Sequence, residues 1–163
     1  MSELTIRAAE PADAEQILGF ITELAIYEKA EHEVVATVED IRERLFGADA
    51  SVYALMAEVA GEPVGFAVYF LNFSTWLGRH GIFLEDLYIT PSARGQGHAT
   101  TLLRYLAQMA VEQGYGRFEW NVLDWNAPAI GFYESLGATP QSEWIGYRLE
   151  GEALAAFAAT PNR

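Results

Sequence analysis

The sequence contains no cysteine. That absence excludes disulfides, thiolate metal sites and a cysteine nucleophile, and it is typical of a protein in a reducing compartment. The three histidines, His32, His80 and His98, lie far apart along the chain and lack the spacing of metal ligands. Long apolar runs are also missing, since stretches such as PVGFAVYFL are too short to cross a bilayer. We therefore expect a cytoplasmic protein with no metal site and no membrane partner.

Positive charge is scarce in this chain. Ten lysines and arginines stand against 23 acidic residues, which gives a formal net charge of -13. A field of this sign repels nucleic acid and anionic membranes and attracts cations. The charge therefore indicates that nucleic acid is not a partner and favours a cationic substrate, although acidity that serves only solubility would look the same.

The length of 163 residues, with 51% hydrophobic residues, favours one compact domain over residues 1–163. The first half has the patterns of a strand, two helices, a hairpin of two strands and a polar-aromatic loop, in that order. We expect these elements at residues 4–9, 11–27, 37–47, 51–59, 63–71 and 72–81.

The second half alternates strand and helix patterns and is punctuated by glycines. The order of elements predicts an α+β fold, with a mixed central β-sheet flanked by helices, an antiparallel N-terminal half and a β-α-β-α C-terminal half. We expect strands at residues 82–89, 117–123 and 143–149, helices at residues 97–113 and 126–137, and an alanine-rich helix in the tail.

The stretch RGQGHA, Arg94 to Ala99, lies where a strand gives way to a helix. Backbone N–H groups at such a turn, with the positive end of the helix, can bind a diphosphate. A nucleoside-triphosphate P-loop is excluded because no lysine follows the glycines. A dinucleotide fingerprint is disfavoured because Glu119 lies in the middle of the next strand rather than at its end. From the turn alone, a diphosphate site and a helix start without a ligand both stay open.

Further motifs accompany this turn. They are YITPSARGQGHATTLL, LDWNAPAIGFYESLGA, an early ELAIYE and a WLG in the loop. Arg94, Gly97 and Ala99 match an Arg/Gln-x-x-Gly-x-Gly/Ala signature, and residues 82–138 resemble the acetyl-CoA-dependent GNAT acetyltransferase superfamily. Taken together, the motifs resemble the diamine N-acetyltransferase family, including its spermidine/spermine and thialysine branches, over nearly the whole chain.

The resemblance implies a site for acetyl-CoA. In that family the glycine turn binds the pyrophosphate of coenzyme A, and the preceding strand hydrogen-bonds the pantetheine through its backbone. The implied cofactor-binding residues are Leu87, Tyr88, Ile89, Arg94, Gly95, Gln96, Gly97, His98, Ala99, Thr100, Asn126 and Tyr133.

Acetyl transfer to an amine needs a base, an oxyanion donor and an acid for the departing sulfur. Glu85 and Asp86 are adjacent carboxylates, and strand alternation sends them to opposite faces unless a β-bulge redirects one. The resemblance implies such a bulge, with Glu85 as the water-linked base and the backbone N–H of Leu87 as the oxyanion donor, while the choice of base between the two carboxylates stays open. It also implies that Tyr133 protonates the coenzyme A sulfur, since a phenol keeps its proton at pH 7.

The substrate contacts are also implied by the resemblance. The residues concerned are Tyr27, Glu28, Trp76, Glu85 and Asp86. Polyamine-specific members carry an acidic residue two positions before the loop tryptophan, whereas this chain has Ser74. That departure puts long polyamines in doubt. Glu31 and Glu33 either replace the missing charge or are solvated surface.

The expected protein is an enzyme, an acetyl-CoA-dependent N-acetyltransferase. Its expected substrate is a primary amine of a small cation, namely a diamine, a polyamine or a thialysine-like amino acid, acetylated by direct attack in a ternary complex. A protein or peptide N-acetyltransferase and a non-catalytic acyl-CoA-binding module are the alternatives. The family is commonly dimeric, and Trp144 and Tyr147 are aromatic residues compatible with a homodimer interface.

Overall fold

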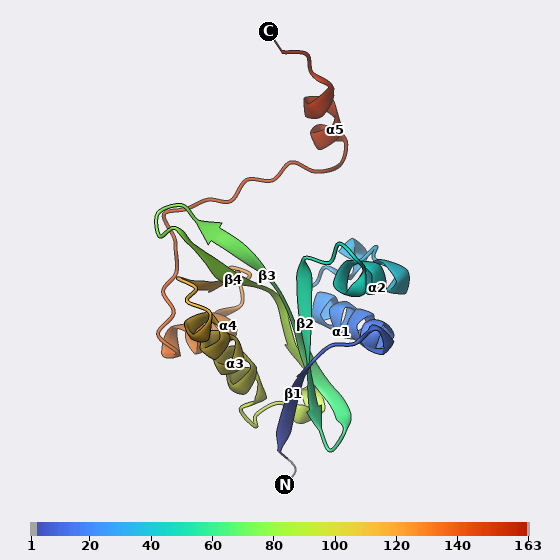
Figure 1. Ribbon diagram of the computed structural model, residues 1–163, viewed down its shortest axis with the longest axis vertical. Coiled ribbons are helices and arrows are strands. Elements are labelled where there is room, and N and C mark those ends of the chain that lie inside the picture. Colours follow the sequence, from blue (N-terminus) through green and yellow to red (C-terminus); the bar gives the residue numbers. More distant parts are fainter. Residues whose placement is uncertain (1–2, 163) are drawn as a thin grey trace. The chain divides into compact units, whose positions relative to one another are not determined.

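The computed structural model describes residues 3–162 (Figure 1). The described chain divides into two compact units, with the boundary between Leu123 and Asp124. That residues 1–163 form a single domain stays a prediction. No helix among the described residues is both long enough and apolar enough to cross a membrane.

The first unit is built on a five-stranded sheet with the strand order β1-β2-β3-β4-β5. Strands β1 to β4 pair antiparallel in sequence order, whereas β5 runs parallel to β4. The sheet is therefore mixed, as the sequence predicts. The strands are β1 (Leu4–Ala8), β2 (Val52–Val59), β3 (Glu62–Ser74), β4 (Arg79–Ile89) and β5 (Phe118–Trp120).

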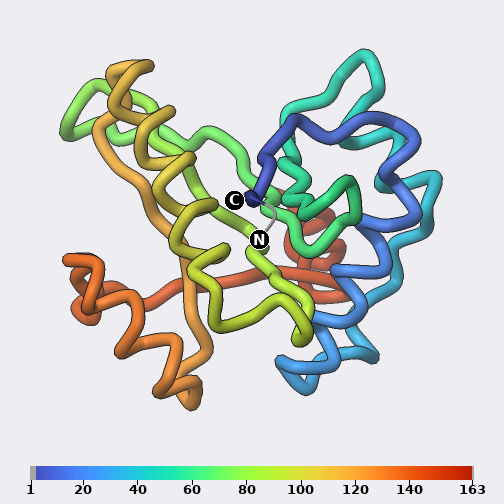
Figure 2. Tube along the Cα trace, turned by 90° about the horizontal axis from the view of Figure 1, so that it is seen from below, coloured from blue at the N-terminus to red at the C-terminus, as the bar shows by residue number. Residues whose placement is uncertain are grey.

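Three helices cover the two faces of this sheet. Helices α1 (Ala14–Tyr27) and α2 (Val38–Phe46) lie on one face, and α3 (His98–Glu112) lies on the other (Figure 1, Figure 2). The start of α2 has the capping box that its sequence predicts, because the Thr37 hydroxyl accepts from the Asp40 N–H and the Asp40 carboxylate accepts from the Thr37 N–H. All three helices begin and end within about three residues of the ranges that the sequence predicts, which are 11–27, 37–47 and 97–113.

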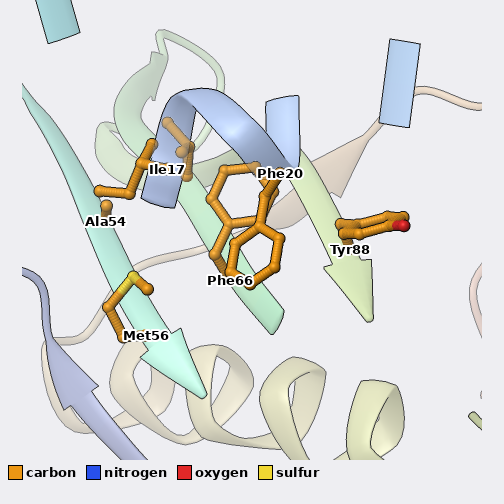
Figure 3. Close-up of a cluster of buried hydrophobic side chains, with 7 residues drawn as sticks. Ile17, Phe20, Ala54, Met56, Phe66 and Tyr88 are labelled. Carbon is orange, nitrogen blue, oxygen red and sulfur yellow. The ribbon is translucent and has the colours of Figure 1, made fainter. Parts of the chain in front are cut away.

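The main hydrophobic cluster lies between α1 and the sheet (Figure 3). The ring of Phe20 on α1 lies 5.5 Å from the ring of Phe66 on β3 and 5.8 Å from that of Tyr88 on β4. Ala54 and Met56 on β2 complete the contact surface, since alternate residues of a strand share one face. This packing holds α1 against β4, the strand that carries Glu85, Asp86 and Leu87.

The second unit contains two short helices. Helix α4 spans Ala127–Ser135, and helix α5 spans Gly151–Ala159. The Asn126 side chain caps α4 by accepting a hydrogen bond of 3.4 Å from the Ala129 N–H. Both helices are where the sequence predicts them.

Three sequence predictions differ from the structure. The loop expected at residues 72–81 is shorter, because β3 continues to Ser74 and β4 starts at Arg79. The strand expected at residues 117–123 is also shorter, since its pairing with β4 ends at Leu84, directly before a bulge. Bulges commonly terminate pairing in this way.

The strand expected at residues 143–149 is wrong. The structure gives this segment no regular strand, and its large apolar side chains are exposed, with Tyr147 at 96%. Alternating apolar residues show only that a segment would suit a half-buried pleated surface. A strand also needs a partner, and no described strand pairs with this segment.

Candidate active site

The glycine turn joins β4 to α3. Gly95 and Gly97 have φ angles of 79° and 80°, in the left-handed region that favours glycine. A Cβ atom built on either residue meets nothing within 4 Å. The glycines are therefore required by backbone conformation, and they leave open space beside the N-terminus of α3, where an anion is stabilised by the helix dipole and by unpaired N–H groups.

Arg94 ties this turn back to the end of β4. Its Nε donates a hydrogen bond of 2.9 Å to the Ile89 carbonyl, and its guanidinium carbon lies 5.5 Å from the centre of the Tyr88 ring. A guanidinium has five N–H donors, so others remain for a ligand at the rim of the turn. The arginine therefore fixes the turn as well as supplying positive charge.

His98, the first residue of α3, is buried. Its Nε2 atom has no hydrogen-bond partner among the described residues. A buried polar atom without a partner costs stability. The side chain thus occupies a core position, and the predicted contact with a cofactor would come from the backbone N–H.

A β-bulge lies in β4 at the predicted carboxylates. Val68 of β3 pairs with Asp86, and the next residue, Tyr69, pairs with Leu84, which leaves Glu85 without an opposite residue. The bulge that the resemblance implies is therefore present. Because directly paired residues share a face, Asp86 lies on the same face as Val68, the face covered by α1.

The bulge also divides one edge of β4. Before it, Ile82, Phe83 and Leu84 pair with β5. After it, Leu87, Tyr88 and Ile89 pair with β3, and no described strand pairs with their other edge. Such an edge presents backbone donors and acceptors to an extended ligand.

Three carboxyl groups come together at the bulge. Burial, and after it the negative charges of Glu85 and Glu28, raise the pKa of Asp86 to about 6. Burial, and then the charge of Glu85, likewise raise the pKa of Glu28, which lies directly after the last residue of α1. Like charges held together in partly desolvated positions favour a proton or a cation between them.

The sequence model of the Acetyltransferase (GNAT) family matches residues 14–138. This range contains the bulge, the glycine turn and helix α4. The chain belongs to this family of acetyltransferases. It is an acetyl-CoA-dependent N-acetyltransferase.

Curated relatives and solved structures agree with this assignment. The acetyltransferase is 37% identical to the thialysine N-epsilon-acetyltransferase of Mus musculus, and the match covers 94% of this chain and 96% of the relative. An integron cassette protein of V. cholerae has the same fold, with a TM-score of 0.82, 27% identity and coverage of 98% of this chain and 99% of that chain. An aminoglycoside N-acetyltransferase solved in complex with CoA also shares the fold, with a TM-score of 0.71, 19% identity and coverage of 93% and 97%.

The structure does not bring together all of the predicted site residues of the acetyltransferase. The charges of Glu85 and Glu28 act on Asp86, and the charge of Glu85 acts on Glu28. Leu87 follows Asp86 directly in β4. Asn126 and Tyr133 belong to the second unit, so their part in the site stays a prediction.

The predicted aromatic contacts are exposed. Tyr27 is 45% exposed at the end of α1, and Trp76 is 79% exposed in the turn between β3 and β4. Ser74 is the last residue of β3, directly before that turn, and its hydroxyl accepts a hydrogen bond of 3.1 Å from the Leu77 N–H. Ser74 therefore has a local structural role, and substrate contacts by Tyr27 and Trp76 stay predictions.

One feature at the end of α1 was missed by sequence reasoning. An open hollow of about 430 Å³ is lined by Ile26, Lys29, Glu31 and His32. Its signal in the sequence is that Lys29 is the only lysine of the chain, and it follows Glu28 directly. The Glu33 carboxylate lies 3.5 Å from the Nε2 atom of His32, and a compensating role for Glu31 and Glu33 stays a prediction.

Proposed function

We propose that this acetyltransferase transfers the acetyl group of acetyl-CoA to a primary amine of a small cationic substrate. A diamine, a polyamine and a thialysine-like amino acid are the substrate types considered. The proposal rests chiefly on the carboxyl groups of Glu28, Glu85 and Asp86 at the β4 bulge. A cation that reaches them relieves their mutual repulsion, so the site is complementary to an ammonium group.

The glycine turn and the strand before it fit coenzyme A. The turn offers open space at Gly95 and Gly97, a helix N-terminus and the arginine Arg94, all suited to a diphosphate. The edge of β4 from Leu87 to Ile89 offers backbone groups to the pantetheine. The proposed cofactor-binding set keeps Leu87, Tyr88, Ile89, Arg94, Gly95, Gln96, Gly97, His98, Ala99, Thr100, Asn126 and Tyr133.

Acetyl-CoA supplies an activated acetyl group that passes directly to the amine in a ternary complex. In this proposal Glu85, at the exposed bulge, accepts the proton of the ammonium through a water molecule. Asp86 and Glu28 hold the cation, the Leu87 N–H donates to the developing oxyanion, and the Tyr133 hydroxyl donates to the sulfur. Each role belongs to a residue of this chain that matches the family's motif.

A steady-state assay of thiol release from acetyl-CoA tests this function. The purified chain is mixed with acetyl-CoA and, separately, with diamines, polyamines, lysine analogues and amino-acid amides. We expect amine-dependent thiol release that saturates with at least one small cationic amine. Tyr133→Phe should lower kcat by about a hundredfold, as expected for loss of a general acid, while the Kd of coenzyme A stays unchanged.

The two alternatives give different results in the same assay. A protein or peptide N-acetyltransferase would acetylate peptide N-termini or lysines better than any small amine. A non-catalytic acyl-CoA-binding module would bind coenzyme A but release no thiol with any amine, and Tyr133→Phe would change nothing. Either pattern overturns the proposal.

We also propose that the protein is located in the cytoplasm and that it forms a homodimer. The absence of cysteine supports a reducing compartment. Trp144 and Tyr147 are 66% and 96% exposed, and aromatic side chains are enriched at protein interfaces.

A further inference from the structure

The side chain of Tyr88 lies between helix α1 and the arginine of the glycine turn. Its ring is 6% exposed and lies 5.8 Å from the ring of Phe20 on α1, and the guanidinium carbon of Arg94 lies 5.5 Å from its centre. Figure 3 shows that its hydroxyl group points away from the hydrophobic cluster. A tyrosine hydroxyl usually has a hydrogen-bond partner when its ring is buried, so the partners of this one are to be sought outside the cluster.

Two charged residues act on this hydroxyl. Glu23 follows Phe20 by three residues on α1, and residues at that spacing are neighbours on one side of a helix. Burial raises the pKa of Tyr88, the Glu23 carboxylate raises it as well through its charge and a hydrogen bond, and Arg94 lowers it through the same two effects. These signs are those of a phenol that donates to the carboxylate and accepts from the guanidinium.

Arg94 is therefore held from two sides. Its Nε donates to the Ile89 carbonyl at 2.9 Å, and its guanidinium lies against the side chain of Tyr88. A long side chain that is already ordered loses less conformational entropy when a ligand arrives. Contacts that fix Arg94 in the free protein therefore strengthen the binding of an anion at the turn.

We infer that Glu23 and the Tyr88 hydroxyl are positioning groups for Arg94, and that through Arg94 they strengthen the binding of the coenzyme A diphosphate. Glu23 accepts from the Tyr88 hydroxyl, the hydroxyl accepts from Arg94, and the remaining N–H donors of Arg94 bind the diphosphate. The inference rests on the proposed function, because it takes the diphosphate to lie at the glycine turn.

The negative charge of Glu23 makes the direction of the effect diagnostic. Coenzyme A is an anion, so an acidic side chain near the turn repels it, and removal of that charge should tighten binding if only electrostatic repulsion counts. If Glu23 positions Arg94, its removal should weaken binding instead. Glu23 is exposed, so physiological salt screens the direct repulsion and leaves the positioning effect to dominate.

Calorimetric titration of coenzyme A at physiological salt tests the inference. Tyr88→Phe and Glu23→Ala should each raise the Kd about three- to fivefold, which is the expected effect of leaving one long side chain unordered before binding. Arg94→Gln should raise the Kd at least about tenfold. In the Arg94→Gln background, Tyr88→Phe should have no further effect, because the side chain that it positions is gone.

Steady-state kinetics separate positioning from a general loss of structure. Tyr88→Phe and Glu23→Ala should raise the KM for acetyl-CoA by the same factor as the Kd, and they should leave kcat and the KM for the amine unchanged. Two matched controls should keep the wild-type values. Tyr53→Phe removes the hydroxyl of an exposed tyrosine in β2, and Glu15→Ala removes an exposed carboxylate from α1.

The possible failures of the inference and of the proposed function are distinguishable. If Arg94→Gln weakens binding but Tyr88→Phe and Glu23→Ala do not, the inference is wrong and the proposed function stands. Tighter binding by Glu23→Ala, or an equal effect of Tyr88→Phe with and without Arg94, would also overturn the inference. An unchanged Kd for Arg94→Gln would contradict the proposed position of the diphosphate, and the inference would fail with it.

Discussion

His98 is a polar side chain in an apolar position. Its ring is buried at the start of α3, and its Nε2 atom lacks a partner among the described residues. We expect His98→Leu to stabilise the protein by about 1 kcal/mol in urea unfolding, because it removes an unsatisfied polar atom and keeps the side chain apolar. The Kd of coenzyme A should not change if His98 contacts it only through the backbone. A loss of stability would show that Nε2 has a partner, such as a buried water molecule.

Asp86 should make stability depend on pH. Burial and neighbouring charges raise its pKa to about 6 in the folded protein, above the value of 3.8 for a free side chain. The folded protein therefore holds a proton that the unfolded chain has released, and this contribution to stability is lost as the pH rises from about 4 to about 6. Asp86→Asn should then be more stable than the wild type by about 1–2 kcal/mol at pH 7.5 and nearly equal to it at pH 4.

Urea unfolding at the two pH values checks this prediction. Asp40→Asn serves as the contrasting variant, because its backbone and side-chain hydrogen bonds to Thr37 lower the pKa of Asp40. That carboxylate stabilises the folded state above its unfolded pKa, so its replacement should destabilise the protein at pH 7.5. An Asp86→Asn variant that loses stability at pH 7.5 would mean that the carboxyl groups are paired with a cation in the free protein.

The residues of the candidate site could be predicted only in part. The strand pattern predicts that Glu85 and Asp86 are neighbours in one strand. It does not predict the β-bulge at which Glu85 has no opposite residue in β3, because one extra residue changes no local propensity. The family resemblance supplied the bulge. Neither source indicated Lys29, since its backbone conformation and its hollow depend on how α1 ends.

At the scale of elements, the turn between β4 and α3 depends on the φ angle of Gly97. A Cβ atom would meet no neighbour there, so any cost of a substitution is conformational. We expect Gly97→Ala to destabilise the protein by about 1 kcal/mol. Gly19→Ala is the matched control, because Gly19 lies in α1 with a helical backbone and its nearest neighbour is 3.8 Å away.

The control should move in the opposite direction. Alanine is favoured over glycine inside a helix by about 0.5–1 kcal/mol, so Gly19→Ala should stabilise the protein. Thermal unfolding followed by circular dichroism measures both variants. Equal effects of the two substitutions would show that Gly97 does not need its left-handed conformation.

The elements could be predicted from the sequence where local chemistry marks their ends. The Thr37–Asp40 capping box and the helix cap at Asn126 are such marks, and both are present. Residues 117–123 and 143–149 could not be predicted correctly, because the length of a strand is set by its partner. The pairing of β5 with β4 stops at the bulge, and the later segment has no described partner strand.

At the scale of the whole molecule, the exposed aromatic residues of the C-terminal segment predict self-association. Light scattering coupled to size exclusion should give twice the chain mass of 18.0 kDa. The double variant Trp144→Glu/Tyr147→Glu should give the single mass, because charge is depleted at interface cores. A wild-type protein of 18.0 kDa, or a variant that stays at twice that mass, would show that this segment does not form the interface.

The central claim is that the turn around Gly97 binds the diphosphate of coenzyme A. Calorimetric titration of coenzyme A into the wild type, Gly97→Ala and Gly19→Ala tests it most directly. The account predicts equal Kd values for the wild type and Gly19→Ala, and a Kd at least about tenfold higher for Gly97→Ala, because its methyl group occupies the space where the diphosphate approaches the backbone. Three equal Kd values, or no binding to the wild type, would contradict it.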